Sequence, residues 1–463
     1  MKVEQLYTNC LAEAAYYIES EGEAAIIDPL RETTPYLKLA EQNGVRIKYI
    51  FETHFHADFV SGHLDLAKQT GATIVFGEGA TPSYSIHCAK DGEEFKIGKL
   101  KIRAIHTPGH TLESTCYLLI DENDKPTSIF TGDTLFINEV GRPDLAVKSN
   151  LSKEDLAGML YDSLHNKIMV LPDDLIVYPA HGAGSACGKN IGKETSDTLG
   201  HQKQVNYALQ KMSREEFVKV ITDGIMPPPQ YFAKNAVLNK LGYESYEEVM
   251  AKGTKPLNAK DFQAKISEGA LVLDTRPPQE FCKGFIPESI NIGLDGTFAV
   301  WVGTLIQDLK QPILVVAENG REAETIMRLA RVGYDNTIGF LKGGIDSWKE
   351  AGHKLDTIQS INAEKFAELY RQSKVLVVDV RKPSEYDNCH LPDALNYPLD
   401  FINENLNKLS KNQPLYLHCA GGYRSMMATS ILRKNGYQNV IDIAGGMGAI
   451  SKTSLPVVRP ETV

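Results

Sequence analysis

The sequence has no run of about 18 consecutive apolar residues, the length that a membrane-spanning helix requires. Its N-terminus has no basic segment followed by an apolar core, so it shows no secretory signal. No low-complexity tract interrupts the chain, and 42% hydrophobic with 23% charged residues is the balance of a folded globular protein. We therefore expect a cytoplasmic protein that does not bind a membrane.

An excess of positive charge is also missing. The 49 lysine and arginine residues face 59 aspartate and glutamate residues, which gives a formal net charge of -10 at pH 7. A negative chain repels the phosphate backbone of nucleic acids and the surface of anionic lipids. Nucleic acid is therefore not expected as a partner, and a small molecule is the expected substrate.

Cysteine is scarce and scattered, which argues against a disulfide framework. The chain has seven cysteines, an odd number, and their spacing suits free thiols in a reducing compartment. They are Cys10, Cys88, Cys116, Cys187, Cys282, Cys389 and Cys419. Any cysteine with a special role is therefore expected to act as a reactive thiol and not as part of a disulfide.

With 463 residues the chain is long enough for several domains. In its first half, short apolar, β-rich runs bounded by turn residues indicate a layered α/β domain. The runs are residues 24–28, 73–76, 127–131 and 175–178. Three consecutive prolines at 227–229 cannot continue a helix and stiffen the chain. We expect a first domain over residues 1–225 and a linker region over residues 226–257.

Beyond the linker region the sequence repeats itself with an offset of 105 residues. The stretch LVLDTRPPQEF from Leu271 is matched by LVVDVRKPSEY from Leu376. The matched pairs are Asp274/Asp379, Arg276/Arg381, Glu280/Glu385, Pro287/Pro392 and Asn291/Asn396. Each copy has about 100 residues, a normal domain size. We expect two tandem α/β domains, over residues 258–356 and 358–463.

Histidines and aspartates follow several of the predicted strands of the first domain. They are His54, His56, Asp58, His110, Asp133 and His181. Loops at strand ends can aim such imidazole and carboxylate groups into one cleft. Because the same residue types recur in the same strand-to-loop context, a metal site is favoured over isolated hydrogen-bonding histidines.

In this order the motifs resemble the metallo-β-lactamase fold, an αββα sandwich, over residues 1–225. Members of that family that hydrolyse thioesters hold two metal ions with the motif H-x-H-x-D-H. The present chain has Phe59 at the position of the last histidine of the motif. Because a phenyl ring cannot coordinate a metal ion, we expect a single ion.

Two histidines and one carboxylate on one face of a metal ion leave up to three open positions, which suits a non-haem Fe(II) that handles O2 and a substrate. The sequence resembles the persulfide dioxygenase branch of the fold. The resemblance implies one Fe(II) per chain, held by His54, His110 and Asp133. The hydrogen-bonding groups expected around these ligands are His56, Asp58 and His181.

Two further residues of the first domain have two interpretations each. Arg142, in the GRPD turn after the Asp133 loop, binds a substrate carboxylate or persulfide, or else forms a structural ion pair. Cys187, six residues after His181, lies at the mouth of the site or packs in the core. The sequence leaves both pairs of interpretations open.

The second copy of the repeat contains a cysteine in a glycine-rich turn. The stretch LYLHCAGGYRS ends an apolar strand at Cys419, turns through Gly421 and Gly422, and enters a helix. Successive backbone N–H groups in such a loop, with the helix N-terminus behind them, form a cradle that stabilises a thiolate or a persulfide. Arg424 is expected to hold a sulfite or sulfonate group.

This copy resembles rhodanese over nearly all of residues 358–455. Related phosphatases place one more residue between the cysteine and the arginine, so the spacing of Cys419 and Arg424 favours sulfur transfer. The first copy has Ala317 at the place of Cys419, in a loop shorter by one residue. Cys282 lies in a different loop, and we expect the first copy to be a structural or docking module.

The whole chain resembles bacterial fusions of a persulfide dioxygenase with rhodanese domains, of the CstB type. The resemblance implies that O2 oxidises a low-molecular-weight thiol persulfide to sulfite and thiol, and that Cys419 converts sulfite to thiosulfate, as in sulfide detoxification. One alternative is a dinuclear zinc thioester hydrolase of the glyoxalase II type, and another is a non-oxidising sulfur carrier or sensor. The identity of the thiol and the number of chains in the assembly stay open.

Overall fold

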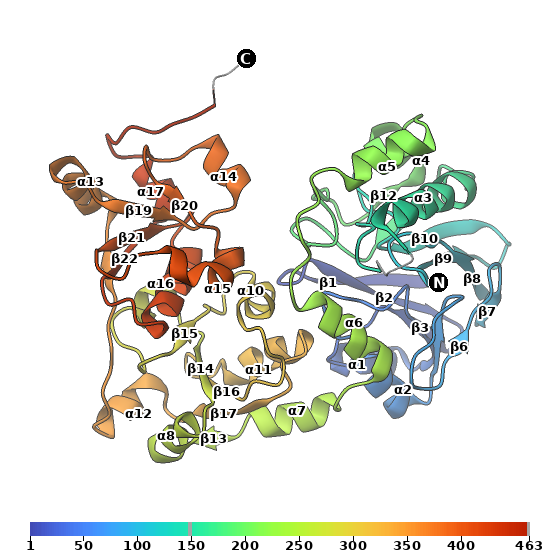
Figure 1. Ribbon diagram of the computed structural model, residues 1–463. Coiled ribbons are helices and arrows are strands. Elements are labelled where there is room, and N and C mark those ends of the chain that lie inside the picture. The colour runs from blue at the N-terminus through green and yellow to red at the C-terminus, as the bar shows by residue number, and fades with distance from the viewer. Residues whose placement is uncertain (147–150, 461–463) are drawn as a thin grey trace. The chain divides into compact units, whose positions relative to one another are not determined.

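The computed structural model describes residues 1–146 and 151–460 (Figure 1). The chain divides into two compact units. The first comprises Met1–Glu247 with Ala330–Gly333, and the second comprises Glu248–Leu329 with the residues from Tyr334 onward. Within the described ranges, no helix combines the length and the apolar character that crossing a membrane requires.

The first unit contains a six-stranded sheet whose strands lie in sequence order. Its strands are β1 (Lys2–Thr8), β2 (Glu13–Ser20), β3 (Glu23–Ile27), β4 (Arg46–Phe51), β5 (Thr73–Phe76) and β6 (His87–Cys88). β1 to β3 are antiparallel, and β3 to β6 are parallel. Parallel strands need crossover connections, and two of these carry helices, α1 (Thr34–Asn43) and α2 (His63–Thr70).

A second six-stranded sheet has the order β12-β11-β10-β9-β8-β7. Its strands are β7 (Glu94–Ile97), β8 (Leu100–His106), β9 (Thr115–Ile120), β10 (Pro126–Gly132), β11 (Ile176–Pro179) and β12 (Asp197–Thr198). The helical segments that follow are α3 (Lys153–Ser163), a π-helical turn (Leu164–Ile168), α4 (Leu199–Val205), a 3-10 turn (Tyr207–Leu209) and α5 (Arg214–Thr222). The N-terminus of α3 is fixed by a capping box between Ser152 and Asp155.

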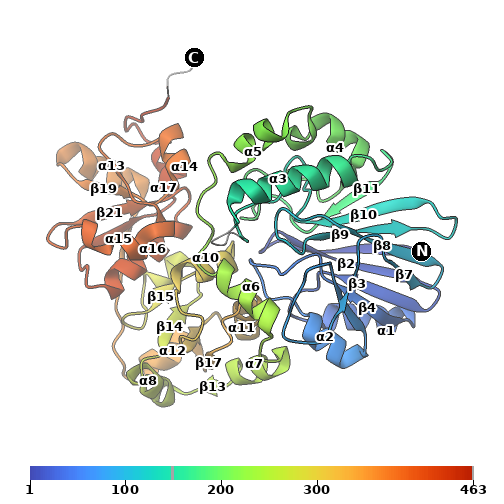
Figure 2. The same ribbon diagram turned by 45° about the vertical axis from the view of Figure 1, so that its right-hand side comes forward.

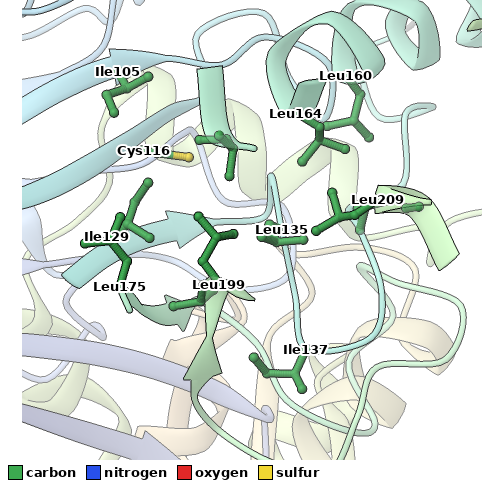
Figure 3. Packing of buried hydrophobic residues seen from close by; sticks show 14 of the residues in the cluster. Ile105, Cys116, Ile129, Leu135, Ile137, Leu160, Leu164, Leu175, Leu199 and Leu209 are labelled. Atoms are coloured by element: carbon green, nitrogen blue, oxygen red, sulfur yellow. The ribbon is translucent and has the colours of Figure 1, made fainter. Parts of the chain in front are cut away.

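Alternating side chains of β9 show how the layers are stacked. Cys116 and Leu118 point into a cluster with Leu160 and Leu164 of the helical layer (Figure 3). Tyr117 and Leu119 point the other way, into the core between the two sheets. In Figure 2, α3 and α5 lie on one side of the two sheets, and α1 and α2 lie on the other. The predicted αββα sandwich is confirmed.

The segment predicted as a linker region is largely helical. Residues 225–229 have no regular structure, as the three prolines require, but α6 (Phe232–Leu241) and α7 (Tyr246–Gly253) follow at once. α6 belongs to the first unit and buries Phe232 and Asn239. The first unit therefore extends to Glu247, beyond the boundary predicted at residue 225.

In the second unit, the first copy of the repeat has a parallel sheet of order β13-β17-β16-β14-β15. The strands are β13 (Pro256–Leu257), β14 (Leu271–Asp274), β15 (Ile290–Asn291), β16 (Ile313–Val316) and β17 (Thr337–Leu341). The helices are α8 (Ala259–Ser267), α9 (Pro278–Phe281), α10 (Phe298–Leu305), α11 (Glu322–Arg331) and α12 (Gly344–Glu350). The central strands β14 and β16 are buried throughout, which explains their unbroken apolar sequences.

The second copy repeats this topology with the order β18-β22-β21-β19-β20. The strands are β18 (Gln359–Ile361), β19 (Leu376–Asp379), β20 (Leu395–Asn396), β21 (Leu415–His418) and β22 (Val440–Ile443). The α-helices are α13 (Ala363–Gln372), α14 (Pro383–Asn388), α15 (Ile402–Asn405), α16 (Tyr423–Lys434) and α17 (Gly446–Ile450), and 3-10 turns flank α15 at Leu399–Phe401 and Leu406–Lys408. The two predicted tandem α/β domains are confirmed.

Three of the residues that the two copies share have the same structural task in each copy. In the first copy the Arg276 guanidinium donates to the Asp274 carboxylate, with Nε 3.0 Å from Oδ1, and the Asn291 amide donates to the carbonyl oxygens of both residues. In the second copy the same contacts are made by Asp379, Arg381 and Asn396. These contacts satisfy buried backbone groups where strands end, so this part of the repeated motif stabilises the fold.

Candidate metal centre and cysteine loop

The histidines and aspartates predicted as a metal site follow the ends of four strands, β4, β8, β10 and β11. The residues are His54, His56, Asp58, His110, Asp133 and His181, and all of them are buried. The structure brings them together in two groups of possible ligands, within each of which the atoms lie within 4.8 Å of one another. The first group is His54, His110 and Asp133, and the second is His56, Asp58 and His181.

Two ligands of the first group directly follow a glycine, at a position that has no room for a side chain. Gly109 has a φ of +149°, and a Cβ there would lie 2.5 Å from the Cα of Leu160. Gly132 has a φ of +51°, and a Cβ there would lie 2.5 Å from Oγ1 of Thr53. A side chain at either position would therefore push the following ligand, His110 or Asp133, out of place.

The geometry of the first group leaves its lone pairs directed at one point. Nε2 of His54 is 3.8 Å and Nε2 of His110 is 3.4 Å from Oδ2 of Asp133. Nδ1 of His110 donates to the carbonyl oxygen of Arg142 at 2.9 Å, which fixes the tautomer with a free lone pair on Nε2. Within the described residues, Nε2 of His110 and both oxygens of Asp133 have no hydrogen-bond partner. Buried lone pairs without a partner fit a metal ion.

The protonation of the two histidines also suits coordination. Burial lowers the pKa of His54 well below its usual value, and the neighbouring imidazoles lower it further. Burial likewise lowers the pKa of His110. Both imidazoles are therefore neutral at pH 7, which is the form that binds a metal ion.

His56 faces a different set of partners from the other histidines. Its Nε2 lies 3.1 Å from Oδ1 of Asp28 and 3.5 Å from Oε2 of Glu52. Burial alone would lower the pKa of His56, but the nearby carboxylates outweigh burial and raise the pKa to about 10. Asp28 also accepts hydrogen bonds from the backbone N–H and the hydroxyl of Thr53, and it so ties the loop to β3.

Phe59 is fully buried and packs on the imidazole of His56, with ring centroids 4.4 Å apart. The second group keeps two members in mutual contact, since Nε2 of His181 is 3.4 Å from Oδ2 of Asp58. The same nitrogen is 3.5 Å from Oδ1 of Asp133, which joins the two groups. A hydrocarbon ring thus lies beside the groups that a second metal ion would need.

Arg142 makes the contacts of a structural residue. Its guanidinium binds Asp144 through Nε at 2.7 Å and Nη2 at 2.8 Å. Its remaining donors reach the carbonyl oxygens of Ala186 and Met226. Of the two roles that the sequence left open, these contacts favour the structural ion pair over binding of a substrate.

Cys187 lies much closer to the metal site than its position in the sequence indicated. Its Sγ can join Asp133 and His181 in a further group of possible ligands. The thiol is buried, and burial together with the carboxylates of Asp58 and Asp133 raises the pKa of Cys187 well above its usual value. It is therefore a neutral thiol beside the metal site.

The cysteine loop of the second copy connects β21 to α16. Cys419 is buried, and its Sγ accepts a hydrogen bond from the backbone N–H of Gly422 at 3.0 Å. Gly422 has a φ of +98°, a conformation that suits glycine and turns this N–H toward the sulfur. Arg424 does not point freely into the cradle, because both of its Nη atoms bind the Glu385 carboxylate at 2.7 Å. Arg424 is therefore already paired with a carboxylate at the place where it was predicted to hold an anion.

The equivalent loop of the first copy has no thiol. Ala317 follows β16 at the place where Cys419 follows β21. The arginine of this loop, Arg321, is bound by the carboxylates of Asp295 and Glu324. Cys282 lies at the end of α9 and is buried with Phe281 and Phe285. The loop thus has no thiol nucleophile, and its arginine, like Arg424, is paired with carboxylates.

Comparison with known proteins agrees with this division. Residues 8–181 match the Metallo-beta-lactamase superfamily, and residues 258–351 and 362–453 each match the Rhodanese-like domain. Over 210 residues the chain is 32% identical to the mitochondrial persulfide dioxygenase ETHE1 of Homo sapiens, a match that covers 45% of this chain and 74% of the relative. The chain belongs to the metallo-beta-lactamase superfamily.

Relatives of the metallo-β-lactamase domain differ in their activities. A probable hydroxyacylglutathione hydrolase of Schizosaccharomyces pombe is 32% identical over 187 residues, 40% of this chain and 68% of the relative. A solved metallo-beta-lactamase structure from Staphylococcus aureus subsp. aureus COL is 30% identical, with a TM-score of 0.64, and covers 74% of this chain and 98% of that chain. Since a dioxygenase and a hydrolase match at the same identity of 32%, identity alone does not separate oxidation from hydrolysis.

One residue of the metallo-β-lactamase domain that sequence reasoning missed is Asn239 of α6. Its amide nitrogen donates to the carbonyl oxygens of His56 and Phe59, each at 2.8 Å, and its Oδ1 accepts from the N–H of Ser61 at 2.9 Å. The side chain is buried. Three hydrogen bonds from one amide therefore hold the loop that carries His54 and its neighbours.

We expect Asn239→Asp to weaken metal binding about 10-fold to 100-fold, because groups that orient metal ligands have effects of this size. The variant keeps the acceptor for Ser61 and loses both donors, which also destabilises the fold by about 2 kcal/mol. The affinity is measured by anaerobic titration with Fe(II) and with Co(II). Asn206→Asp is the matched control, since Asn206 also donates to two carbonyl oxygens and accepts one N–H, in the loop of Phe136 and Glu139. Equal metal affinities in the two variants would contradict the role of Asn239.

Proposed function

We propose that the protein is a mononuclear non-haem Fe(II) persulfide dioxygenase whose sulfite product is converted to thiosulfate by its rhodanese domain. One combined observation carries this proposal. The group of His54, His110 and Asp133 is intact, and the phenyl ring of Phe59 stands at the position of the last histidine of the H-x-H-x-D-H motif. We further propose cytoplasmic localisation, where reducing conditions keep the seven cysteines as thiols.

The proposed iron ligands are His54, His110 and Asp133. Two neutral imidazoles and one carboxylate match the donor set that Fe(II) oxygenases use and leave positions for O2 and substrate. Bound there, Fe(II) supplies the O2 and one-electron chemistry that no protein side chain has. The proposal leaves His56 outside the ligand set, because its Nε2 faces Asp28 and Glu52.

The residues around the proposed ligands have two tasks. Thr53 and the carbonyl oxygen of Arg142 orient the imidazoles through their Nδ1 atoms, at 2.9 Å in each case. Burial of the whole site, including Asp58 and His181, keeps bulk water away from a reactive substrate. The overall reaction is R-S-S⁻ + O2 + H2O → R-SH + SO3²⁻ + H⁺, in which the terminal sulfur of the persulfide is oxidised and O2 is reduced.

The second proposed step occurs at Cys419. Its thiolate takes the outer sulfur of a persulfide and releases the thiol, and sulfite then attacks that sulfur and leaves as thiosulfate. The sum is R-S-S⁻ + SO3²⁻ + H⁺ → R-SH + S2O3²⁻, with no net oxidant required. The Gly422 N–H at 3.0 Å from the sulfur supports this role, since it stabilises negative charge there. Arg424, held by Glu385, would attract the sulfite anion.

A dinuclear zinc thioester hydrolase is the second candidate. The second ligand group, His56, Asp58 and His181, favours it, as does the match to a hydroxyacylglutathione hydrolase. Phe59 counts against it, because the fold would then have to bind the second ion with one ligand fewer. Metal content and O2 consumption separate the two candidates.

We expect protein loaded anaerobically with Fe(II) to bind about one iron per chain and to consume O2 when a thiol persulfide is added. The reason is the single group of two histidines and a carboxylate. Metal content is measured by mass spectrometry, and O2 uptake is measured with an electrode across persulfides of different thiols. Two tightly bound zinc ions with thioester hydrolysis and no O2 uptake would contradict the proposal.

Asp133→Ala is expected to lose at least about nine tenths of the bound iron and all measurable O2 uptake while it keeps its fold, because one of three ligands is removed. Circular dichroism checks the fold, and mass spectrometry checks the iron. Asp58→Ala is the matched control, which removes a buried carboxylate outside the proposed ligand set and should keep most of the iron. The ligand assignment is wrong if the two variants behave the other way round.

Cys419→Ser is expected to keep O2 uptake and to release sulfite in place of thiosulfate, because a serine hydroxyl cannot carry a sulfane sulfur. Arg424→Ala should give a milder form of the same change, since it keeps the nucleophile. Sulfite, thiosulfate and O2 are quantified in the same reaction. Cys389→Ser, a cysteine of the same copy outside the cradle, is the control and should form thiosulfate as before. Thiosulfate at the wild-type rate from Cys419→Ser would assign the transfer to another group.

A further inference from the structure

One face of α16 belongs to the first copy of the repeat, although the helix is part of the second copy. Tyr423, Met426, Ser430 and Arg433 have the spacing i, i+3, i+7 and i+10, which places them on one side of the helix. Each of the four contacts the first copy or the segment that joins the copies. In Figures 1 and 2, α16 lies beside β15, the edge strand of the first copy. The other side of α16 packs on β21 and β22 of its own sheet.

Tyr423 lies against two glycines of the first copy, Gly293 and Gly296. Its hydroxyl donates to the carbonyl oxygen of Gly293 at 2.7 Å. A Cβ on Gly293 would lie 3.2 Å from Cε2 of the ring, and a Cβ on Gly296 would lie 3.3 Å from Cζ. The two glycines therefore form a flat seat on which the tyrosine ring rests.

The rest of the face is fixed by contacts of three different kinds. Met426 is buried in an apolar cluster with Phe281 and Phe285 of the first copy. The buried hydroxyl of Ser430 accepts the N–H of Asn291 in β15 at 3.0 Å, so the helix satisfies a donor at the open edge of that sheet. The side chain of Arg433 forms an ion pair with Asp356.

This face begins at the cysteine loop itself. Tyr423 follows Gly422, whose N–H reaches the sulfur of Cys419. The loop is held from the second copy at its start, where the N–H groups of Met447 and Gly448 donate to the carbonyl oxygens of Cys419 and Ala420 at 2.7 Å and 2.9 Å. At its end, Arg424 and Ser425 are bound within the second copy, by Glu385 and Asp442, while Tyr423 is bound in the first copy, by Gly293.

We propose that the first copy of the repeat, which has no catalytic cysteine, is the positioning element of the sulfur-transfer loop, and that Tyr423 is the positioning residue through which it acts. The seat formed by Gly293 and Gly296 sets where the loop ends, and so sets the distance from the Gly422 N–H to Cys419 Sγ. This inference rests on the proposed sulfur transfer at Cys419 and gives the first copy a task in it.

The test substitutes a residue of the first copy and measures the effect on sulfur transfer at Cys419. Gly293 has a φ outside the left-handed region, so Gly293→Ala adds a methyl group without backbone strain and displaces the Tyr423 ring by a few tenths of an ångström. We expect kcat for sulfur transfer from thiosulfate to cyanide to fall about 5-fold or more, with KM for thiosulfate changed less than 2-fold, because misplacement of a reacting group lowers the rate more than the affinity. The reaction is S2O3²⁻ + CN⁻ → SO3²⁻ + SCN⁻.

Two further variants separate positioning from loss of stability. Tyr423→Phe keeps the ring and loses the hydrogen bond to Gly293, and we expect kcat to fall about 2-fold to 3-fold. Tyr370→Phe is the matched control, since its hydroxyl donates to the carbonyl oxygen of Pro392 at 2.8 Å within the second copy, and it should keep the wild-type kcat. In a Tyr423→Ala background, Gly293→Ala should have little further effect, because the contact through which it acts is gone.

A second readout is independent of sulfur transfer. The rate at which iodoacetamide alkylates Cys419, measured by mass spectrometry of the Cys419 peptide, should change at least about 3-fold in Gly293→Ala and should not change in Tyr370→Phe. If the full-length protein has no transferase activity but this change is seen, the proposed function fails and the positioning by the first copy stands. Wild-type kcat and a wild-type alkylation rate in Gly293→Ala would overturn the inference.

Discussion

The metal centre depends on one constraint, which is that imidazole and carboxylate groups must be buried together without leaving their polar atoms unsatisfied. The protein meets this constraint by supplying acceptors and donors from the loops themselves. Thr53, Asp28 and the carbonyl oxygen of Arg142 take the outward-facing polar atoms. The lone pairs that face the centre of the site have no hydrogen-bond partner among the described residues. Because they lie close together, the site is suitable for a metal ion.

The same constraint shapes the two rhodanese-like copies, with a different result. Each copy buries an aspartate and an arginine at the end of a central strand and pairs them with each other. Only in the second copy does the neighbouring loop add a thiol, at Cys419. The same fold-stabilising motif therefore lies beside a thiol in one copy and beside Ala317 in the other.

Local patterns in the sequence were sufficient to predict the sandwich, the two copies of the repeat and the residues that meet at the metal centre. Each ligand follows a strand, and strand ends converge by topology, so residue order alone carried that information. The orientation of His56 was not predictable, because it depends on Asp28, which follows another strand, as well as on Glu52 of its own loop. The contacts of Arg142 depend in the same way on residues far along the chain.

Asn239 and α6 show which contacts of the segment predicted as a linker region the sequence did not indicate. Three prolines gave a correct local signal for residues 227–229, but the helix after them is held by bonds to a loop about 180 residues earlier. A single sequence contains no record of such a pairing. The seat of Tyr423 on Gly293 and Gly296 is a second contact of this kind.

The two-sided packing of α16 has a consequence for how the chain can be divided. A rhodanese domain cut out near residue 357 would expose the tyrosine and methionine that the first copy now covers, and β15 would lose the acceptor for its edge N–H. The two copies therefore stabilise each other through this helix. Removal of the first copy is therefore expected to lower the stability of the second copy, and the second copy is not a freely separable module.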